Sequence, residues 1–472
     1  MTVINLDLFA QIGRSIVVCA NLFSRTFPSV MHLKEYYREF FPITLLYNML
    51  SMHKRMPFAN REFALFFEND GQLKCQRKVA FQHAEAFFRR IMATVPTTID
   101  IGAVYPLLPR HLKFSSACAV RTRRELVFDI DLSDYDSVRF CPCKKGAGHA
   151  SCDVCWLFID LAVQVMDFLL ERKFGLVHRF WVFSGSKGVH CWVLDATAVD
   201  YGKEMRQGVC NYLEFRDASQ LFECPIAREC YDSIIFPFFR KRLFPYLPKS
   251  TMLEYLSAFA KPVLDAEGFE CLSAAIAAGE PLLACVEKLD KHTKRAFSRV
   301  HYPVFICGLL APRLDHNVTT SEKHLLKAPF AVHKRTQAIA LPMSSDDIRN
   351  FSPSAAITLQ SSSQLVTQLV ASSVAYLSDV VILAKPLPEL YVCTKCASSD
   401  MRHEDLHASV VYDFVDSLFE HYRRSHATES PNVSENTLAY LISRQCTDIF
   451  GPGSATGLQL TWRRRLQDLN LL

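Results

Sequence analysis

Residues 125–135 read Glu-Leu-Val-Phe-Asp-Ile-Asp-Leu-Ser-Asp-Tyr, and the fold is organised around this stretch. Apolar residues at every second position up to Ile130 predict a β-strand with one apolar face. Asp129 and Asp131 therefore lie side by side on the other face. Two carboxylates held this close repel each other unless a cation lies between them, and Mg²⁺ or Mn²⁺ prefers oxygen ligands of this kind. The alternative is two solvated acids at a strand end, so the choice depends on the rest of the chain.

The composition is that of a globular protein. The chain has 472 residues, half of them apolar, which is enough for two or three domains with a substantial core. Lys and Arg number 53 against 48 acidic residues, and the net charge of +5 permits a nucleic-acid partner without arguing for one. The most apolar segment, 156–170, contains three polar side chains and is too short to span a membrane. The apolar segment 15–23 reads as a helix rather than a signal peptide.

The cysteines are unevenly spread and include two Cys-x-x-Cys pairs. This usage indicates an intracellular, reducing compartment with metal binding rather than a disulfide framework. Four thiolates in two close pairs suit a tetrahedral, structural zinc site, and they follow the acidic strand directly: Cys141, Cys143, Cys152 and Cys155. His149, in the glycine-rich loop between the pairs, is an alternative ligand, and reduced thiols without a metal are the alternative to the site itself.

Helices and strands alternate before the acidic strand. The spacing of apolar residues predicts helices at 30–42 and 79–93. A turn at 69–71 between two alternating segments predicts a β-hairpin, and residues 99–105 return to a strand pattern. Asp100 stands between two isoleucines on that strand, where an acid usually has a partner or a ligand.

A glycine-rich turn joins two further apolar strands, 179–183 and 189–194. Its sequence at 184–188, Ser-Gly-Ser-Lys-Gly, lets a backbone approach an anion, and Lys187 adds a positive charge. His190 follows just after the turn. Alone this is a weak signal, because a glycine hairpin with one lysine is usually only a hairpin.

The second half of the chain is less regular. Residues 199–300 have mostly helical patterns and basic patches without a catalytic constellation, so a solvated helical insertion is expected. Polar side chains return with Asp315 and with the segment 324–333, which holds two histidines and a lysine that a core does not need. After Pro342 the chain is serine-rich. This last region contains a weaker candidate zinc site: Cys393, Cys396, His403 and His407.

Taken in order, these motifs resemble the catalytic small subunit of the eukaryotic-type DNA primases, of the archaeo-eukaryotic primase superfamily. The match runs from about residue 30 to 345 outside the helical middle, and each motif alone would be weak. The matching stretches are Tyr36-Tyr-Arg38, Asn60-Arg-Glu-Phe63, Asp100-Ile-Gly-Ala-Val-Tyr105, the acidic strand, the cysteines up to Trp156, Ser184 to Val193, and Arg313 to Phe330.

The resemblance implies a primase fold of the α/β (α+β) class. Its catalytic domain, built on a mixed sheet, is expected at 1–198 and 301–345, with a zinc-binding knob at about 139–156. An inserted helical subdomain is expected at 199–300. A variable C-terminal region of unknown role follows at 346–472.

The resemblance also implies roles for single residues. Two Mg²⁺ or Mn²⁺ ions would activate a 3′-hydroxyl and neutralise the leaving pyrophosphate, and their ligands would be Asp129, Asp131 and Asp315. The triphosphate of the incoming nucleotide would be bound by Ser184, Lys187 and His190. The rest of the nucleotide pocket would be lined by Arg61, Asp100, His324, Lys327 and His333. Among these, Asp100 is the candidate acceptor for a ribose 2′-hydroxyl.

The expected function is the synthesis of short RNA primers from nucleoside triphosphates on a single-stranded DNA template. Expected partners are the primase large subunit and the DNA polymerase α complex, in the nucleus and without a membrane. One alternative is a single-chain primase-polymerase, although such enzymes often carry Glu where Asp131 stands. Another is a silent, zinc-bearing nucleic-acid-binding subunit, which has no need of carboxylates that repel when no metal is bound.

The sequence departs from the family pattern in three places. Ser186 and Lys187 stand where arginine is common, and a lysine lacks the bidentate grip of a guanidinium. Gln337 replaces a usual glycine, which alters a turn. The first cysteine pair is Cys-x-Cys and is followed by a longer, glycine-rich spacer, so the sequence leaves open which atoms complete the zinc site.

Overall fold

The computed structural model describes residues 32–52, 56–69, 72–114, 123–141, 143, 151–217, 220–248, 250–251, 254, 266–279, 301–321 and 323–384. Contacts divide the chain into two units, Ile4–Lys385 and Met1–Val3 with Pro386–Leu472, and the described residues belong to the first. The predicted features at 15–23, His149 and the second candidate zinc site lie outside the described residues. Within the described part, no helix has the length and apolarity that a membrane span requires.

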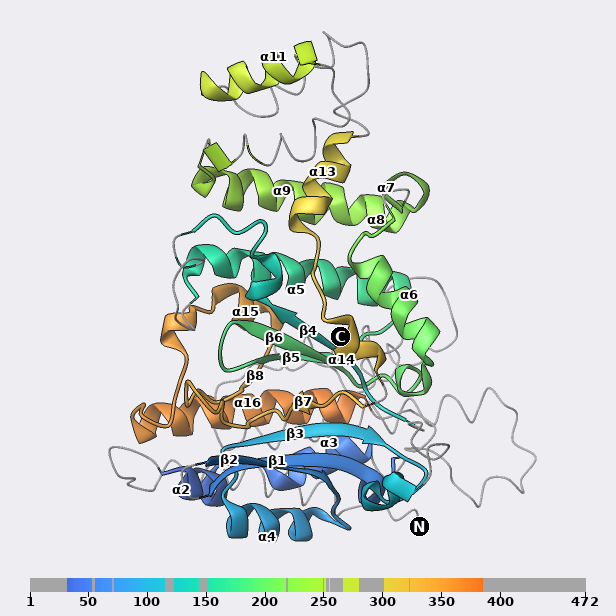
Figure 1. The fold of residues 1–472 in the computed structure, drawn as a ribbon, viewed down its shortest axis with the longest axis vertical. Coiled ribbons are helices and arrows are strands. Elements are labelled where there is room, and N and C mark those ends of the chain that lie inside the picture. Colours follow the sequence, from blue (N-terminus) through green and yellow to red (C-terminus); the bar gives the residue numbers. More distant parts are fainter. Residues whose placement is uncertain are drawn as a thin grey trace, which may run out of the picture. The chain divides into compact units, whose positions relative to one another are not determined.

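Two four-stranded sheets organise this unit (Figure 1). The first has the order β2-β1-β3-β7, with β1 Arg61–Asn69, β2 Gln72–Val79, β3 Thr98–Val104 and β7 Leu326–Lys327. The second has the order β4-β6-β5-β8, with β4 Leu126–Asp131, β5 Arg179–Phe183, β6 Gly188–Val193 and β8 Pro342–Met343.

Every strand pair in these two sheets is antiparallel, so the expectation of a mixed sheet is wrong for the described residues. The reason lies in the second sheet. A helix connects β4 to β5, which would make them parallel neighbours, but β6 returns from the β5 hairpin and lies between them. The predicted hairpins of β1 with β2 and of β5 with β6 are confirmed.

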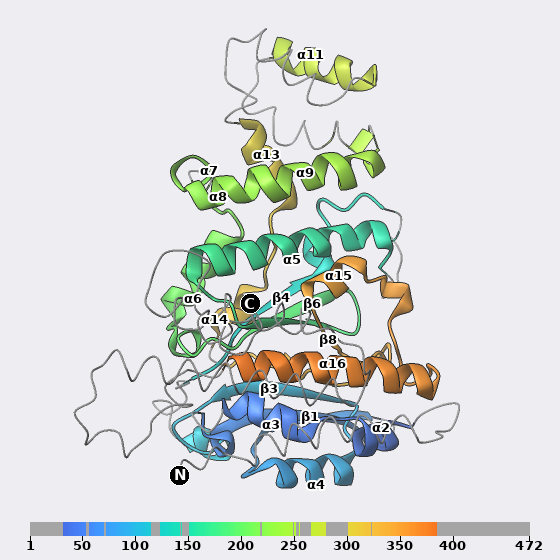
Figure 2. The same cartoon turned by 180° about the vertical axis from the view of Figure 1, so that it is seen from behind.

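Helices cover the sheets, and most predicted helices are present (Figures 1 and 2). Those before the acidic strand are α2 Leu33–Glu39, α3 Ile43–Ser51 and α4 Ala84–Thr94. Those after it are α5 Asp153–Phe174, α6 Lys203–Leu213, α7 Gln220–Glu223, α8 Pro225–Cys230, α9 Phe236–Phe238, α11 Ala266–Ala277, α13 His301–Leu310, α14 His316–Thr320, α15 Ser345–Asn350 and α16 Ser363–Leu383. The described part of 203–277 contains helices and no strand, while the domain boundaries stay a prediction.

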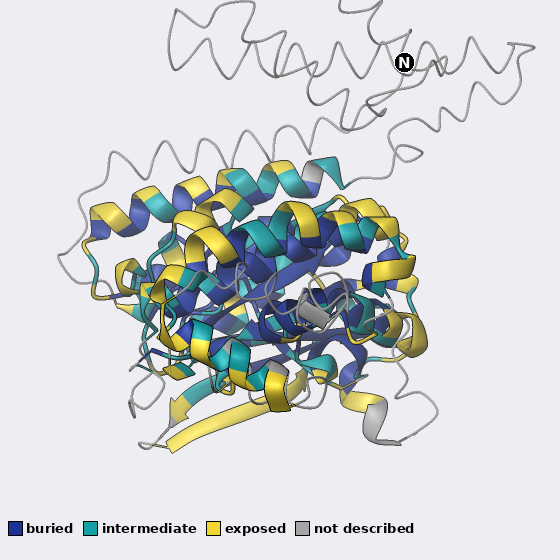
Figure 3. Ribbon diagram, turned by 90° about the horizontal axis from the view of Figure 1, so that it is seen from above, coloured by how far each residue is buried: buried dark blue, intermediate teal, exposed yellow. Residues whose placement is uncertain are grey.

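The second sheet is buried on both faces, which an antiparallel sheet need not be. On one face Leu126, Phe128 and Ile130 pack with α5 in one core. On the other face Val127 belongs to a second core, which includes the first sheet and α16. The alternation predicted for β4 is thus confirmed, and Asp129 and Asp131 emerge at the end of a strand that two cores hold in place. By contrast, β2 is exposed along nearly its whole length, as an edge strand rich in basic residues (Figure 3).

Candidate active site and metal centre

One cavity of about 310 Å³ brings together most of the predicted site residues. Acids from the end of β4 meet cationic and imidazole side chains from the β5–β6 hairpin, from β7 and from the segment after it. The lining residues are Asp129, Asp131, Ser133, Ser184, Ser186, Lys187, His190, Lys327, His333 and Arg335.

The register of β4 against β6 sets the two acids beside the hairpin turn. Asp129 pairs with His190, and Asp131 pairs with Gly188. A Cβ atom at Gly188 would lie 1.9 Å from the carbonyl oxygen of Ile130, so only glycine permits this close approach. The turn is closed by the Ser184 hydroxyl, which accepts the Gly188 N–H at 3.2 Å. The glycine that the sequence offered as an anion-binding feature therefore also docks the turn onto the acidic strand.

Asp315 joins the acidic strand through the backbone. Its N–H donates to the carbonyl oxygen of Asp129 at 3.1 Å, and its carboxylate caps α14 by accepting the Asn317 N–H at 2.8 Å. Asp131 is oriented in the same way, because its Oδ1 accepts the N–H and the hydroxyl of Ser133 at 2.7 and 2.6 Å. Two of the three carboxylates are thus fixed by caps at the starts of short helices.

Burial, followed by the charges of Asp131 and Asp315, raises the pKa of Asp129 to about 7. Asp129 and Asp131 line the cavity, and Asp315 lies outside its lining but near enough for its charge to act on Asp129. Carboxylates that repel one another favour a bound cation, and their oxygens suit Mg²⁺ or Mn²⁺. The carboxylates are more widely spaced than the cysteines described below, which form the one cluster of described residues whose ligand atoms all lie within 4.8 Å.

His190 lies between the acids and the cations. Its Nε2 is 3.7 Å from Oδ1 of Asp129. Burial, followed by the charges of Lys327 and His333, lowers the pKa of His190 to about 3, so the ring is neutral at physiological pH. Its Nδ1 is buried and has no hydrogen-bond partner among the described residues. Such an atom is costly unless a ligand satisfies it.

Lys327 brings the first sheet to the cavity. It pairs with Asp100 across β3 and β7, and its Nζ donates to the carbonyl oxygen of Ser184 at 2.7 Å. Burial lowers the pKa of Lys327 to about 8, although the negative charges of Asp100 and Asp129 act to raise it. Burial also raises the pKa of Asp100 to about 6, although nearby cations oppose the shift. Asp100 does not line the cavity itself, but it is the cross-strand partner of Lys327, which does.

The structure does not bring Arg61 to the cavity, and its predicted place in the pocket is corrected here. Its side chain is 0% exposed and is paired with both carboxylate oxygens of Glu125 at 2.8 and 3.0 Å. It also donates to the carbonyl oxygens of Gly102 and Leu50 at 2.9 and 2.7 Å. The two terminal nitrogens of the guanidinium are satisfied in this way, while its buried Nε has no partner among the described residues, and the side chain joins β1 to the start of β4. His324 also lies outside the lining, half-buried, and burial lowers its pKa.

Three lining residues were not predicted as ligands from the sequence: Ser133, Ser186 and Arg335. Ser133 donates to Asp131, and its signal was an Asp-x-Ser cap directly after the acidic strand. Arg335 lines the cavity from a turn that packs against the β5–β6 hairpin. The sequence signal for Arg335 was the pair of cations Lys334 and Arg335 directly after His333, in the segment where Gln337 alters a turn.

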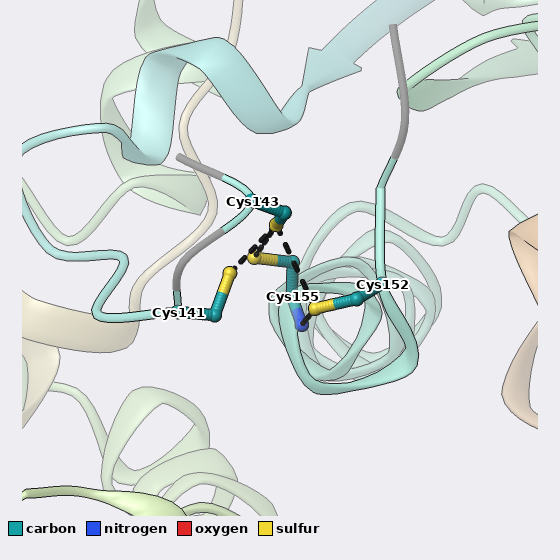
Figure 4. Close-up of side chains that lie close together, drawn as sticks. All are labelled: Cys141, Cys143, Cys152 and Cys155. Atoms are coloured by element: carbon teal, nitrogen blue, oxygen red, sulfur yellow. Dashed lines mark hydrogen bonds between the residues drawn. The ribbon is translucent and has the colours of Figure 1, made fainter. Parts of the chain in front are cut away.

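The four cysteines form a compact group next to the acidic strand (Figure 4). The Sγ of Cys143 lies 3.2 Å from that of Cys155 and 3.6 Å from that of Cys152. Zinc–sulfur bonds of about 2.3 Å in a tetrahedron place the sulfurs ~3.8 Å apart, so this donor set fits zinc. Arg139 contributes positive charge, since its guanidinium donates to Cys155 Sγ at 3.5 Å and is ion-paired with Asp136.

Replacement of one of these cysteines is expected to remove the metal. Cys143→Ser should lower bound zinc from one per chain to near zero, because three thiolates hold zinc far less tightly than four. Metal content by mass spectrometry and the melting temperature check this. Cys75→Ser is the matched control, because Cys75 is exposed and lies outside the cluster. Stoichiometric zinc in the Cys143→Ser protein would contradict the assignment.

Comparisons with known proteins place these features in a family context. A family profile described as DNA primase small subunit matches residues 128–345. The chain is 31% identical to the DNA primase small subunit of Caenorhabditis elegans over 352 residues. This alignment covers 67% of the present chain and 82% of the C. elegans protein. The identity to the DNA primase small subunit of Drosophila melanogaster is 30% over 359 residues. This alignment covers 69% of the present chain and 79% of the D. melanogaster protein. A polymerase domain from Mycobacterium tuberculosis Ligase D, solved in complex with DNA, is 13% identical over 72% of this chain and 88% of that one. Its TM-score of 0.33 is too low to carry a structural argument.

Proposed function

Since this chain belongs to the DNA primase small subunit family, we propose that it synthesises short RNA primers from nucleoside triphosphates on single-stranded DNA. The observation that carries this proposal is that Asp129 and Asp131 line the same cavity as Lys187, Lys327 and His190. A transfer reaction between phosphates needs both halves: acids that hold divalent cations, and cationic groups that hold the phosphates.

We infer that Asp129, Asp131 and Asp315 hold two Mg²⁺ or Mn²⁺ ions. Bound there, the ions would activate the 3′-hydroxyl of the primer and stabilise charge on the α-phosphate and on the leaving pyrophosphate. Burial is the main cause of the raised pKa of Asp129, and repulsion from Asp131 and Asp315 adds to it. A cation between the carboxylates would relieve that repulsion, which supports the inference.

The remaining residues of the cavity would bind and orient the nucleotide. Lys187 and Lys327 offer ammonium groups to the triphosphate, and neutral His190 offers a ring nitrogen that has no partner among the described residues. The Ser184 hydroxyl lies at the same turn. Asp100, held beside Lys327, is the candidate acceptor for the 2′-hydroxyl that distinguishes a ribonucleotide.

We further propose the remaining parts of the assembly from the family. A structural zinc would stabilise the knob at 139–156, and the helical segment 199–300 would form the inserted subdomain between the two parts of the catalytic domain. The C-terminal region 346–472 has no assigned role. The proposed partners are the template DNA, the primase large subunit and the DNA polymerase α complex, and the proposed location is the nucleus.

The test is nucleotide incorporation on a single-stranded poly-pyrimidine template, with the purified chain, labelled purine nucleoside triphosphates and Mg²⁺ or Mn²⁺. Short labelled RNA that depends on the template is the expected product. Absence of product even with a supplied RNA primer and the large subunit would favour a silent nucleic-acid-binding subunit instead.

The affinity for nucleoside triphosphate is expected to fall as the pH rises above about 8. Because burial lowers the pKa of Lys327 to about 8, its ammonium is charged below that pH and neutral above it. Phosphate groups titrate near pH 6 and stay ionised throughout. The measurement is KM for the nucleotide from about pH 7 to about pH 9.5, where wild-type KM should rise by up to about tenfold per pH unit.

The matched variant is Lys327→Arg, whose guanidinium keeps its charge over this range. Its KM should stay nearly constant relative to its own value at neutral pH. A pH-dependent rise as large as that of the wild type would show that another group is responsible.

A further inference from the structure

We propose that Arg335 is a ligand of the terminal phosphates of the incoming nucleotide, acting together with Lys187 of the neighbouring hairpin. The proposal deepens the function argued above and rests on it. Arg335 lines the cavity but lies on none of the strands that carry the predicted site residues. Arg335 lies in the turn between His333 and Ala338.

This turn is fixed against the β5–β6 hairpin. The Thr336 hydroxyl donates to the carbonyl oxygen of Gly185 at 2.6 Å, and the His333 N–H donates to the carbonyl oxygen of Ala338 at 2.8 Å. A Cβ atom at Gly185 would lie 2.6 Å from Cβ of His333, so the hairpin glycine lets the two turns pack together. The backbone of Arg335 is therefore held in a fixed place beside Lys187.

Hydrogen bonds inside the turn direct its residues. Nδ1 of His333 accepts the N–H groups of Thr336 at 3.2 Å and of Arg335 at 3.4 Å. This keeps the backbone of Arg335 folded back over the imidazole that lines the cavity. The neighbouring cation, Lys334, lies elsewhere, with its Nζ 5.7 Å from the centre of the Phe66 ring.

The three cations of the cavity have no close carboxylate partner among the described residues, although the charges of Asp100 and Asp129 act on Lys327 from farther away. Within the part of the chain that the structure describes, neither Lys187, Lys327 nor Arg335 forms an ion pair within 4.0 Å with a carboxylate. Burial is the main cause of the lowered pKa of Lys327, and the charges of Lys334 and Arg335 lower it further while those of Asp100 and Asp129 oppose the shift. Three cations around one cavity call for a polyanion, and a triphosphate carries enough charge to satisfy them.

The position of Arg335 selects the terminal phosphates. The α-phosphate must lie next to Asp129 and Asp131, where the reaction takes place, and Lys327 is buried near Asp129. Arg335 is an exposed residue of the lining, so it lies at the rim of the cavity. A guanidinium binds two phosphate oxygens at once, a grip that the single lysine of the hairpin cannot supply.

The test compares Arg335→Ala and Arg335→Lys with Lys334→Ala, the adjacent exposed cation outside the cavity. The measurements are Kd for ATP, ADP and AMP and for a single-stranded DNA template, and kcat and KM for incorporation. We expect Arg335→Ala to weaken ATP binding by about tenfold or more, as loss of a charged hydrogen-bonding group does. AMP and template binding should stay the same, KM should rise with kcat nearly unchanged, and Arg335→Lys should recover part of the loss.

The named outcomes separate this proposal from the proposed function. Wild-type affinity for ATP in Arg335→Ala would overturn the phosphate assignment, and equal losses of ATP and AMP would overturn the choice of the terminal phosphates. A loss confined to template binding would make Arg335 a ligand of the DNA backbone and would also overturn it. Failure of the wild type to bind ATP or to make RNA would instead reject the function itself.

Discussion

Asp129→Asn is expected to abolish primer synthesis, with nucleotide incorporation reduced by about 10³-fold or more. A carboxamide carries no charge, so it cannot neutralise the cations that this acid would hold together with Asp131 and Asp315. Electrostatic stabilisation by such ions is worth several kcal/mol of the barrier, and about 4 kcal/mol corresponds to this loss of rate. The poly-pyrimidine assay with Mg²⁺ or Mn²⁺ measures it.

The same variant should not unfold the protein, and this separates a catalytic effect from a structural one. Burial and its acidic neighbours raise the pKa of Asp129 from 3.8 to about 7. The metal-free protein therefore loses stability as the pH rises from 3.8 to about 7, because the carboxyl group ionises more easily in the unfolded chain than in the folded one. Because asparagine has no charge, the metal-free Asp129→Asn protein should melt at the same temperature as the wild type, or above it, at about pH 8.

Asp134→Asn is the matched control for this experiment. Asp134 lies close enough to raise the pKa of Asp129 but does not line the cavity. Its replacement should leave most of the activity. Comparable activity of Asp129→Asn and the wild type would refute the assignment of this acid to the metal site.

Arg61→Ala should destabilise the protein by about 3–5 kcal/mol, which is the cost of leaving a buried partner charge unpaired. Glu125 would keep its carboxylate in the interior, where both of its oxygens now accept from Arg61. Two backbone carbonyls would lose their donor as well. Urea denaturation and the melting temperature measure the effect, which should amount to a shift on the order of 10 °C.

The chain contains its own control for this prediction. Arg77 and Glu62 form a second Arg–Glu pair on the same sheet at 3.2 Å, but the Arg77 side chain is 48% exposed. The Glu62 side chain is only 4% exposed, but it keeps the Tyr105 hydroxyl as a donor at 3.4 Å, and water reaches Arg77, so Arg77→Ala should cost clearly less than Arg61→Ala. The double variant Arg61→Met with Glu125→Leu should recover most of the loss, since apolar residues replace buried pairs well. Equal effects of Arg61→Ala and Arg77→Ala would show that burial of the first pair is unimportant.

Local patterns predicted the parts of the site that lie on regular strands. The alternation around Asp129 and the glycines around Lys187 are local signals, and the cross-strand pairing of Asp129 with His190 follows once the two strands meet. The docking of Arg335 was not predictable in this way. It depends on a turn that reaches the hairpin from about 150 residues farther along the chain, through the bond from Thr336 to Gly185.

Two errors had the same physical cause, a polar side chain whose partner is distant in sequence. Arg61 looked like a surface or ligand residue because nothing near it signals Glu125, 64 positions away. The polar side chains within the apolar segment 156–170, which lies in α5, would be solvated if that part of the helix were exposed. Instead, Asp160 is 1% exposed, and Asp167 accepts hydrogen bonds from Arg179, from the indole of Trp181 and from Ser345.

The bond from Lys327 to the hairpin at Ser184 has a consequence for folding. The first sheet supplies Lys327, and the second supplies the acids and the hairpin, so neither sheet alone contains the whole cavity. A partly folded chain with only one sheet assembled would lack a nucleotide site. A nucleotide that binds only the docked arrangement shifts the unfolding equilibrium toward it by mass action. Substrate would therefore act as a pharmacological chaperone for the finished enzyme, protecting most strongly those variants that loosen the junction between the sheets.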